Sequence, residues 1–417
     1  MKKFILDISP LNLGKEKVSN GVARVTLETI KAIYSDKNFK LYFYVSQADN
    51  YLLCKQYILL NTEFKDVVFL NDGDTIISKL LLLLLKYYIR ILTKLGVSKT
   101  TGFVSRLKTK IINNCLENKD IYYSTFFDIP TVLKRLSRIA KYIFVHDLIP
   151  VKFPEYFGIP KGSQNHYLYT VFKKLDINTT VITNSENTKR DFLLFRPDFP
   201  KEKVKVNYLA ASSSFKNNTD NKKLNSVKLK CSIPLESSYF ITNSTLEIRK
   251  NLDHVIECFF MFLEKYKIDN LYLVLTGKKG WNADKIFKVL ESNSKYREKI
   301  ILTGFVSDEE LAILYSGALC FTYMSLYEGF GLPPLEAMQS GCPVITSNNS
   351  SLPEIVGKSG VLLDSNDHKS LVNSFYRFYS DTSFRNEFKE KAMEQSKLFS
   401  WEKYSKTLIT ILNSSIE

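Results

Sequence analysis

Short apolar runs alternate with helical patterns along most of this chain, and this alternation limits its fold more than any other feature. The runs have the length and the β-branched or aromatic content of strands, and they lie at 3–8, 41–45, 121–124, 142–145, 181–184, 204–209, 239–243, 271–276, 300–303, 320–324, 344–346 and 360–363. Strands that are separated by helices pair in parallel, with helices covering the faces of the sheet. The sequence therefore predicts an α/β protein.

A polar stretch divides this alternation into two parts. Residues 212–230 contain few apolar side chains and many turn formers, and 417 residues are too many for one typical domain. We therefore expect an N-terminal domain over 1–212, a linker over 213–235 and a C-terminal domain from 236 onward, each built like a Rossmann domain. The 45% hydrophobic content is typical of a globular chain with an ample core.

The segment after the run 320–324 places two carboxylates on either side of a glycine turn. Glu328 comes at the carboxyl end of the expected strand, the turn Gly329-Phe330-Gly331 follows, and Leu332 with two prolines opens a helix that carries Glu336. Ligands of parallel sheets bind at this end of a strand, glycines expose the backbone, and a helix N-terminus attracts phosphate. The pattern predicts a nucleotide-sugar site in which the carboxylates bind hydroxyl groups. A plainer interpretation gives Glu336 only the role of a first-turn acid that stabilises the helix dipole.

The string 325–338 resembles the donor-site signature of the family-4 retaining glycosyltransferases, in which two glutamates are separated by seven residues. The similarity continues through 341–345 and 351–357. The resemblance implies a GT-B fold, in which two Rossmann-like domains face each other across a cleft, the nucleotide-sugar domain spans 236–399, and a helix over 400–417 packs back on the N-terminal domain. It also implies retaining transfer of a hexose, with mannose as the first guess, from a nucleotide diphosphate sugar to an acceptor hydroxyl, without a cofactor or a metal ion.

Arg249 and Lys250 follow the run 239–243, where adjacent cations can neutralise a diphosphate. An ordinary solvated basic pair before a helix is the alternative interpretation. The segment resembles the phosphate-binding loop of the same family, although Asn243 and Ser244 replace its glycine-rich opening. The resemblance implies that Lys250 and Arg249 stabilise the leaving diphosphate together with backbone amides at 329–332. It also implies that Glu328 orients the donor sugar and that Glu336 binds the ribose.

Three segments of the N-terminal half are similar to parts of the family that line the cleft. His146 and Asp147 follow the run 142–145 and match a His-Asp-Leu motif, which implies that His146 contacts the transferred sugar or the acceptor and that Asp147 lies on the acceptor side. A lone histidine is more often structural. Gly21 lies in a loop that approaches the donor phosphates and the acceptor in the family. Ser185 matches a serine at the next strand end, although a helix N-cap is its simplest role.

A net charge of +15 predicts an anionic partner. Nucleic acid is not expected, because the basic residues lie in none of the usual nucleic-acid-binding motifs. Lys79, Lys86, Arg90 and Lys94 form one helical stripe in the leucine-rich and tyrosine-rich segment 79–95, whose apolar run is too short to span a membrane. The segment fits either a helix that lies on an anionic membrane surface or a buried helix of the N-terminal domain with one solvated basic face.

The cysteines and the first residues predict the compartment. The apolar run at 3–8 is too short for a signal peptide, and the six cysteines show neither close pairing nor metal-ligand spacing. We therefore expect a reduced cytoplasmic protein, which lies on the inner face of the cell membrane if the basic segment binds lipid. The acceptor is then expected to be a glycan or a lipid-linked glycan of bacterial surface polysaccharide assembly.

Alternative functions of such a chain are an inert, membrane-associated scaffold with the same fold, a sugar-nucleotide epimerase and a phosphorylase. The intact Glu328, Glu336 and Lys250 argue against the scaffold. The two glutamates do not predict a glycosidase, because the acid and base of a glycosidase face each other across a sugar ring rather than flank a phosphate turn. Nucleotide binding that depends on Glu336 and Lys250 would separate the transferase from the scaffold.

Overall fold

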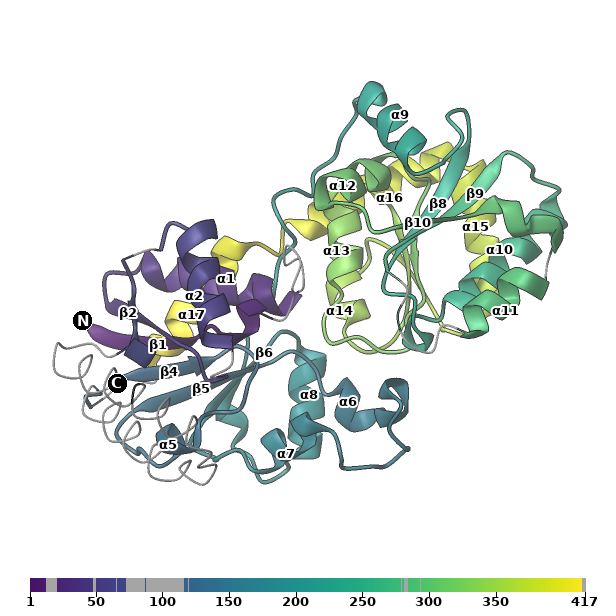
Figure 1. Cartoon of the computed structure of the whole chain (residues 1–417). Coiled ribbons are helices and arrows are strands. Elements are labelled where there is room, and N and C mark those ends of the chain that lie inside the picture. Colours follow the sequence, from purple (N-terminus) through teal and green to yellow (C-terminus); the bar gives the residue numbers. More distant parts are fainter. Residues whose placement is uncertain are drawn as a thin grey trace.

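The computed structural model places the chain in two α/β domains, which lie next to each other in Figure 1. It describes residues 1–12, 21–47, 50–64, 66–72, 87, 116–118, 120–278, 280, 284–292 and 294–414. The basic segment 79–95 lies outside the described residues except for Tyr87, so both interpretations of that segment remain predictions.

The N-terminal sheet has the strand order β3-β2-β1-β4-β5-β6-β7 in the described part of the chain, and its neighbouring strands pair in parallel. The strands are β1 (Lys2–Asp7), β2 (Phe39–Tyr44), β3 (Val68–Phe69), β4 (Ile121–Ser124), β5 (Ala140–Val145), β6 (Thr180–Thr183) and β7 (Val204–Val206). The helices of this domain include α1 (Gly21–Tyr34), α2 (Tyr51–Asn61), α5 (Thr131–Lys134), α6 (Ile149–Lys152), α7 (Tyr167–Lys173) and α8 (Glu186–Phe195). The central strand β4 is buried along its whole length, as expected for a parallel sheet that is covered on both faces.

The C-terminal sheet has the order β10-β9-β8-β11-β12-β13 and is also parallel. Its strands are β8 (Ser238–Asn243), β9 (Leu271–Thr276), β10 (Ile300–Gly304), β11 (Phe321–Tyr323), β12 (Val344–Ser347) and β13 (Val361–Leu363). Its helices include α9 (Asn221–Lys230), α10 (Leu252–Tyr266), α11 (Asp284–Ser292), α12 (Asp308–Gly317), α13 (Leu332–Gln339), α14 (Leu352–Val356), α15 (His368–Ser380) and α16 (Thr382–Ser396). A capping box opens α12, where Ser307 and Glu310 each accept a hydrogen bond from the other's backbone N–H.

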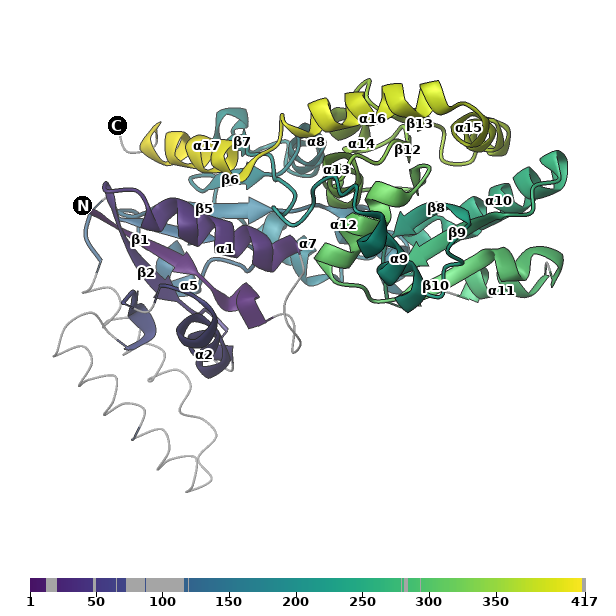
Figure 2. The ribbon, with the colours of Figure 1, turned by 90° about the horizontal axis from the view of Figure 1, so that it is seen from above.

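The last described helix, α17 (Trp401–Ser414), packs on the N-terminal domain rather than on the domain that precedes it. The hydroxyls of Tyr404 and Thr29 on α1 are 2.8 Å apart, and the side-chain amide of Asn207 donates to the Tyr404 carbonyl oxygen over 3.2 Å. Figure 2 shows α16 above the C-terminal domain and α17 continuing beside α1. The helix therefore crosses between the domains in the way that the resemblance implies.

Two features differ from the expectation drawn from the sequence. Strand β3 was not expected, because it consists of two residues that pair with β2 and is too short to form an apolar run in the sequence. The expected linker 213–235 contains the helix α9, whose residues Val227 and Lys228 are buried. Lys228 donates from Nζ to the carbonyl oxygens of Leu235 and Ser237 over 2.6 Å and 2.8 Å, which offsets the burial of its charge. The polar composition of this segment thus belongs to a mostly exposed helix and not only to a connection.

None of the helices that the structure describes has both the length and the apolar character that a membrane-spanning helix needs.

Candidate active site

The carboxyl ends of strands from both domains meet at the turn Gly329-Phe330-Gly331. A Cβ built at Gly329 would lie 2.4 Å from the carbonyl oxygen of His146, which follows β5, and 2.7 Å from the Cβ of Asp147. A Cβ at Gly21, the first residue of α1, would lie 3.2 Å from Cδ1 of Leu332. The fold therefore brings the expected residues of both domains together, and Gly329 is required there because a side chain would overlap the opposite backbone.

Glu328 is the centre of a buried polar cluster at the carboxyl end of β11. Its Oε1 accepts hydrogen bonds from Lys250 Nζ over 2.7 Å, from the Tyr323 hydroxyl over 2.8 Å and from the Ser325 hydroxyl over 2.6 Å, and it lies 2.9 Å from Arg249 Nη1. Only 8% of the residue is exposed. Four polar contacts on one buried oxygen fix the position of this side chain closely.

The charges around Glu328 decide its ionisation. Burial alone raises the pKa of the carboxyl group, but the positive charges of Arg249 and Lys250 and the hydrogen bonds that Glu328 accepts outweigh burial and lower the pKa to about 2. Burial lowers the pKa of Lys250, and the neighbouring Arg249 lowers it further, while Glu328 raises it. Glu328 is thus a carboxylate throughout the physiological range of pH, with two cations beside it.

Arg249 and Lys250 lie in the turn that leads into α10, and other residues of the C-terminal domain hold their side chains in place. Arg249 donates from Nη1 to the Tyr327 carbonyl oxygen and from Nη2 to Glu247, each over 2.7 Å. Lys250 also donates to the Tyr323 hydroxyl over 2.6 Å and is 9% exposed. These contacts exclude the solvated basic pair that was the alternative interpretation of this dipeptide.

Glu336 lies in α13, behind the turn, and contacts the other domain. The helix begins at Leu332 after Gly331, whose φ of +124° suits glycine, and the prolines at its start need no hydrogen-bond acceptor. Oε1 of Glu336 accepts a hydrogen bond over 2.9 Å from Nη1 of Arg24 on α1, and Nη2 of the same arginine is 2.9 Å from Asp308 on α12. Burial raises the pKa of Glu336, while Arg24 lowers it. The carboxylate that is expected to bind ribose therefore also forms an ion pair between the domains.

His146 and Asp147 reach the turn from the N-terminal domain. His146 Nε2 lies 2.8 Å from the Thr125 carbonyl oxygen, and since a carbonyl only accepts, Nε2 carries the proton and Nδ1 has a lone pair. Burial lowers the pKa of His146 to about 4, so the ring is neutral near pH 7. Asp147 accepts from the backbone N–H of Ile149 over 2.9 Å, and burial raises its pKa. His146 is thus a neutral hydrogen-bonding group rather than a cation.

The N-terminus of α8 holds the C-terminal domain. The expected N-cap Ser185 accepts from the Thr188 N–H, and its hydroxyl also donates to the Gly329 carbonyl oxygen over 2.6 Å. Glu354, from α14, accepts from the backbone N–H groups of Glu186 and Asn187 over 3.0 Å and 3.1 Å. An acid of one domain therefore occupies the positive end of a helix in the other.

Several residues of the site were not found from the sequence. Tyr323 and Ser325 come shortly before Glu328 and donate hydrogen bonds to it. Tyr323 belongs to an apolar run, and such a run does not indicate that the hydroxyl of one of its tyrosines binds a carboxylate. Arg24 follows Gly21 by one helical turn, yet its partners Glu336 and Asp308 lie in the other domain, which no local pattern could connect. The only signal for these residues was their place beside the motifs.

Known proteins resemble the chain in both sequence and fold. The family model for glycosyl transferases group 1 matches residues 228–395. The O-antigen chain mannosyltransferase B of Escherichia coli is 31% identical over 283 residues, which cover 68% of this chain and 71% of that protein. The O-antigen chain mannosyltransferase RfbU of Salmonella typhimurium is 25% identical over 253 residues, or 61% of this chain and 63% of that protein.

Two solved structures resemble the whole fold. Sucrose-phosphate synthase from Thermosynechococcus elongatus superposes with a TM-score of 0.64 and 16% identity, over 99% of each chain. WaaG, a glycosyltransferase involved in lipopolysaccharide biosynthesis, gives a TM-score of 0.62 with 12% identity, over 98% of this chain and 99% of that one. The expected GT-B architecture is confirmed. By the match to mannosyltransferase B, together with the family model on its C-terminal domain, the chain belongs to the group 1 glycosyltransferases.

Proposed function

We propose that the protein transfers mannose, with retention of configuration, from a nucleotide diphosphate mannose to a hydroxyl group of a glycan acceptor. The observation that carries the proposal is the buried Glu328, which lies between Arg249 and Lys250 at a glycine turn that touches His146 of the other domain. A sugar diphosphate has hydroxyl groups for the carboxylate and a double negative charge for the two cations.

The leaving group defines the roles of the cations. The bond between the anomeric carbon and the diphosphate oxygen breaks, and Arg249, Lys250 and the backbone amides from Gly329 to Leu332 stabilise the charge that develops on that oxygen. The acceptor oxygen bonds to the same face of the anomeric carbon, and its proton passes to the departing phosphate oxygen. No step requires a metal ion or a cofactor, because the charge is neutralised by side chains and by the start of α13.

The remaining residues position the two substrates. Oε1 of Glu328 is engaged by its four partners, so the carboxylate orients the donor sugar through Oε2. Neutral His146 accepts a hydrogen bond from a sugar or acceptor hydroxyl at Nδ1, and Asp147 lies on the acceptor side. Glu336 binds the ribose hydroxyls, so the ribose and Arg24 compete for its carboxylate.

The substrates are inferred from the relatives and from charge. The names of the relatives specify mannosyltransferases of O-antigen chains, which supports mannose and a surface polysaccharide. A net charge of +15 suits a lipid-linked, diphosphate-bearing acceptor at the inner face of a membrane, to which the protein binds peripherally from the cytoplasm. The inert scaffold is less well supported, since it gives no reason for a carboxylate held ionised among buried cations.

A ligand panel tests the donor site directly. Thermal unfolding is followed with nucleoside diphosphates and their mannose conjugates, in the wild type and in the Glu336→Ala and Lys250→Ala variants, because a ligand that binds only the native state raises the melting temperature. We expect one nucleotide to stabilise the wild type and neither variant. The absence of a shift with every nucleotide in a folded wild type would support the scaffold.

The reaction itself needs a second measurement. The preferred donor is incubated with a mannose-terminated glycan, with and without a chelator, and the anomeric configuration of the product is read from its NMR coupling constants. Retention without added metal supports the proposed chemistry. An inverted product would refute same-face transfer while leaving the donor site intact.

A further inference from the structure

A second cluster of reactive side chains lies outside the cleft, where α10 meets the start of α15. The donor atoms of His254, Cys258 and His368 lie within 4.8 Å of one another. His254 lies in the first turn of α10, four residues after Lys250, and His368 is the first residue of α15. The proposed transfer uses none of these three residues.

The sequence of α10 places two of the ligands on one face of the helix. His254 and Cys258 are four residues apart and point to the same buried side of the helix, and Glu257, three residues after His254, lies at the exposed edge of that side. Cys258 Sγ lies 3.7 Å from His254 Nε2. In a tetrahedral zinc site, bond lengths of about 2.3 Å to sulfur and about 2.0 Å to nitrogen put these two ligand atoms about 3.5 Å apart. The observed separation fits a shared metal ion.

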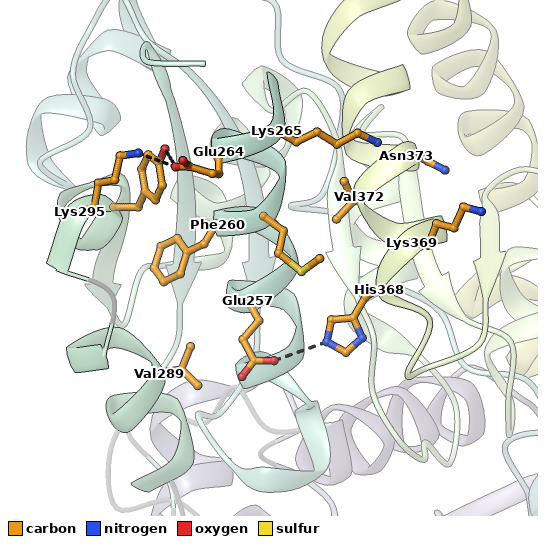
Figure 3. A pocket seen from close by; sticks show the side chains of 12 residues that line it. Glu257, Phe260, Glu264, Lys265, Val289, Lys295, His368, Lys369, Val372 and Asn373 are labelled. Carbon is orange, nitrogen blue, oxygen red and sulfur yellow. Dashed lines mark hydrogen bonds and ion pairs between the residues drawn. The ribbon is translucent and has the colours of Figure 1, made fainter. Parts of the chain in front are cut away.

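The first residue of α15 supplies the third ligand. His368 Nδ1 lies 3.2 Å from the Asn366 carbonyl oxygen, so Nδ1 carries the proton and the lone pair is on Nε2. That Nε2 is 3.5 Å from Oε2 of Glu257, a contact drawn in Figure 3, and a nitrogen and an oxygen ligand of one zinc ion lie about 3.4 Å apart. A backbone acceptor that orients a histidine in this way is typical of metal-bound histidines.

One side of the cluster is exposed, and an ion can enter from that side. His254 is 6% exposed and Cys258 is fully buried, whereas about half of the side chains of His368 and Glu257 is exposed. His368 and Glu257 line a pocket of about 880 Å³, whose other walls come from α10, α11, α15 and the segment that carries Lys295 and Tyr296 (Figure 3). The pocket gives solvent access to one side of the cluster, and the helices close the other.

We propose that His254, Cys258 and His368 bind one zinc ion, with the carboxylate of Glu257 as the fourth ligand. Two imidazoles, one thiolate and one carboxylate are ligands that zinc accepts in tetrahedral geometry. The ion would join the first two turns of α10 to the first turn of α15. Because Asn251, just before α10, donates to the Ser365 carbonyl oxygen over 2.8 Å, the ion would also brace the loop that carries Arg249 and Lys250.

Metal content and spectroscopy test the site in the full-length chain, purified without a histidine tag. Zinc is titrated into metal-free protein, bound metal is counted after dialysis, and cobalt(II) is substituted for zinc. We expect one equivalent of zinc, tetrahedral cobalt bands with a thiolate-to-cobalt charge-transfer band, and a melting temperature that rises until one equivalent is bound.

Two ligand variants and two matched controls distinguish this site from other thiols and imidazoles. Cys258→Ala and His368→Ala should each bind zinc more than about tenfold more weakly, and the cysteine variant should lose the charge-transfer band. Cys231→Ala and His166→Ala, which each remove the same kind of group elsewhere, should behave like the wild type. The side chain of His368 is half-exposed, so we expect His368→Ala to fold even if Cys258→Ala, which loses a buried thiol, does not fold. Binding of no zinc by the wild type, or binding by both ligand variants that is as tight as in the wild type, would overturn the proposal.

Discussion

Replacement of Glu328 by glutamine should remove the pH-dependent contribution that Glu328 makes to the stability of the protein. The carboxyl pKa falls from 4.5 to about 2 in the folded protein. Each unit of difference is worth about 1.4 kcal/mol, so the ionised group contributes about 3 kcal/mol at neutral pH. Since the folded pKa is the lower one, this stability is complete above pH 4.5 and is lost as the pH falls through about 2.

The assay is urea unfolding of the wild type and of Glu328→Gln between about pH 7 and about pH 3, and the quantity of interest is the difference between their free energies of unfolding. That difference should shrink by about 2 kcal/mol over the range, because the other titrating groups cancel in the comparison. Glu394→Gln, which changes an exposed ion pair, is the control and should alter stability by less than about 1 kcal/mol at any pH. A difference that does not vary with pH would refute the argument that Arg249 and Lys250 hold Glu328 ionised.

The other predictions concern transfer kinetics. Gly329→Ala should lower kcat/KM by about a hundredfold, because its Cβ would overlap the His146 carbonyl oxygen and move the turn; unchanged kinetics would mean that the domains do not approach as closely in the reacting enzyme. Glu354→Gln should raise the donor KM about fivefold, since about 1 kcal/mol of interaction with the start of α8 is lost, and steady-state kinetics with an unaltered KM would contradict that role. The wild-type pH profile should lack an inflection near 6.5, because the pKa of His146 is about 4 and the ring protonates only in acid; an inflection that disappears in His146→Gln would show that the imidazole titrates normally.

Local patterns predicted most of the fold and the centre of the site. Strand positions followed from apolar runs because a parallel sheet buries both faces, and the strand-turn-helix around Glu328 followed from the chemistry of glycine and proline. Strand β3 and helix α9 were missed since two paired residues and a mostly exposed helix leave little hydrophobic signal. Arg24 was missed because its partners depend on how two separate domains meet. The cysteine spacing likewise could not suggest the proposed zinc site, because His368 is 110 residues from Cys258.

Because α17 returns to the N-terminal domain, the chain crosses from one domain to the other twice, once between β7 and α9 and once between α16 and α17. Two connections that run in opposite directions restrict the relative rotation of the domains more than a single connection would. A rotation about the line through both crossings that moved the two domains apart would break the contact of Glu354 with α8 and the ion pair of Arg24 with Glu336. A protease cut between α16 and α17 would leave the two domains joined by the chain between β7 and α9, whereas a cut between β7 and α9 would leave them joined only by the packing of α17 on the N-terminal domain.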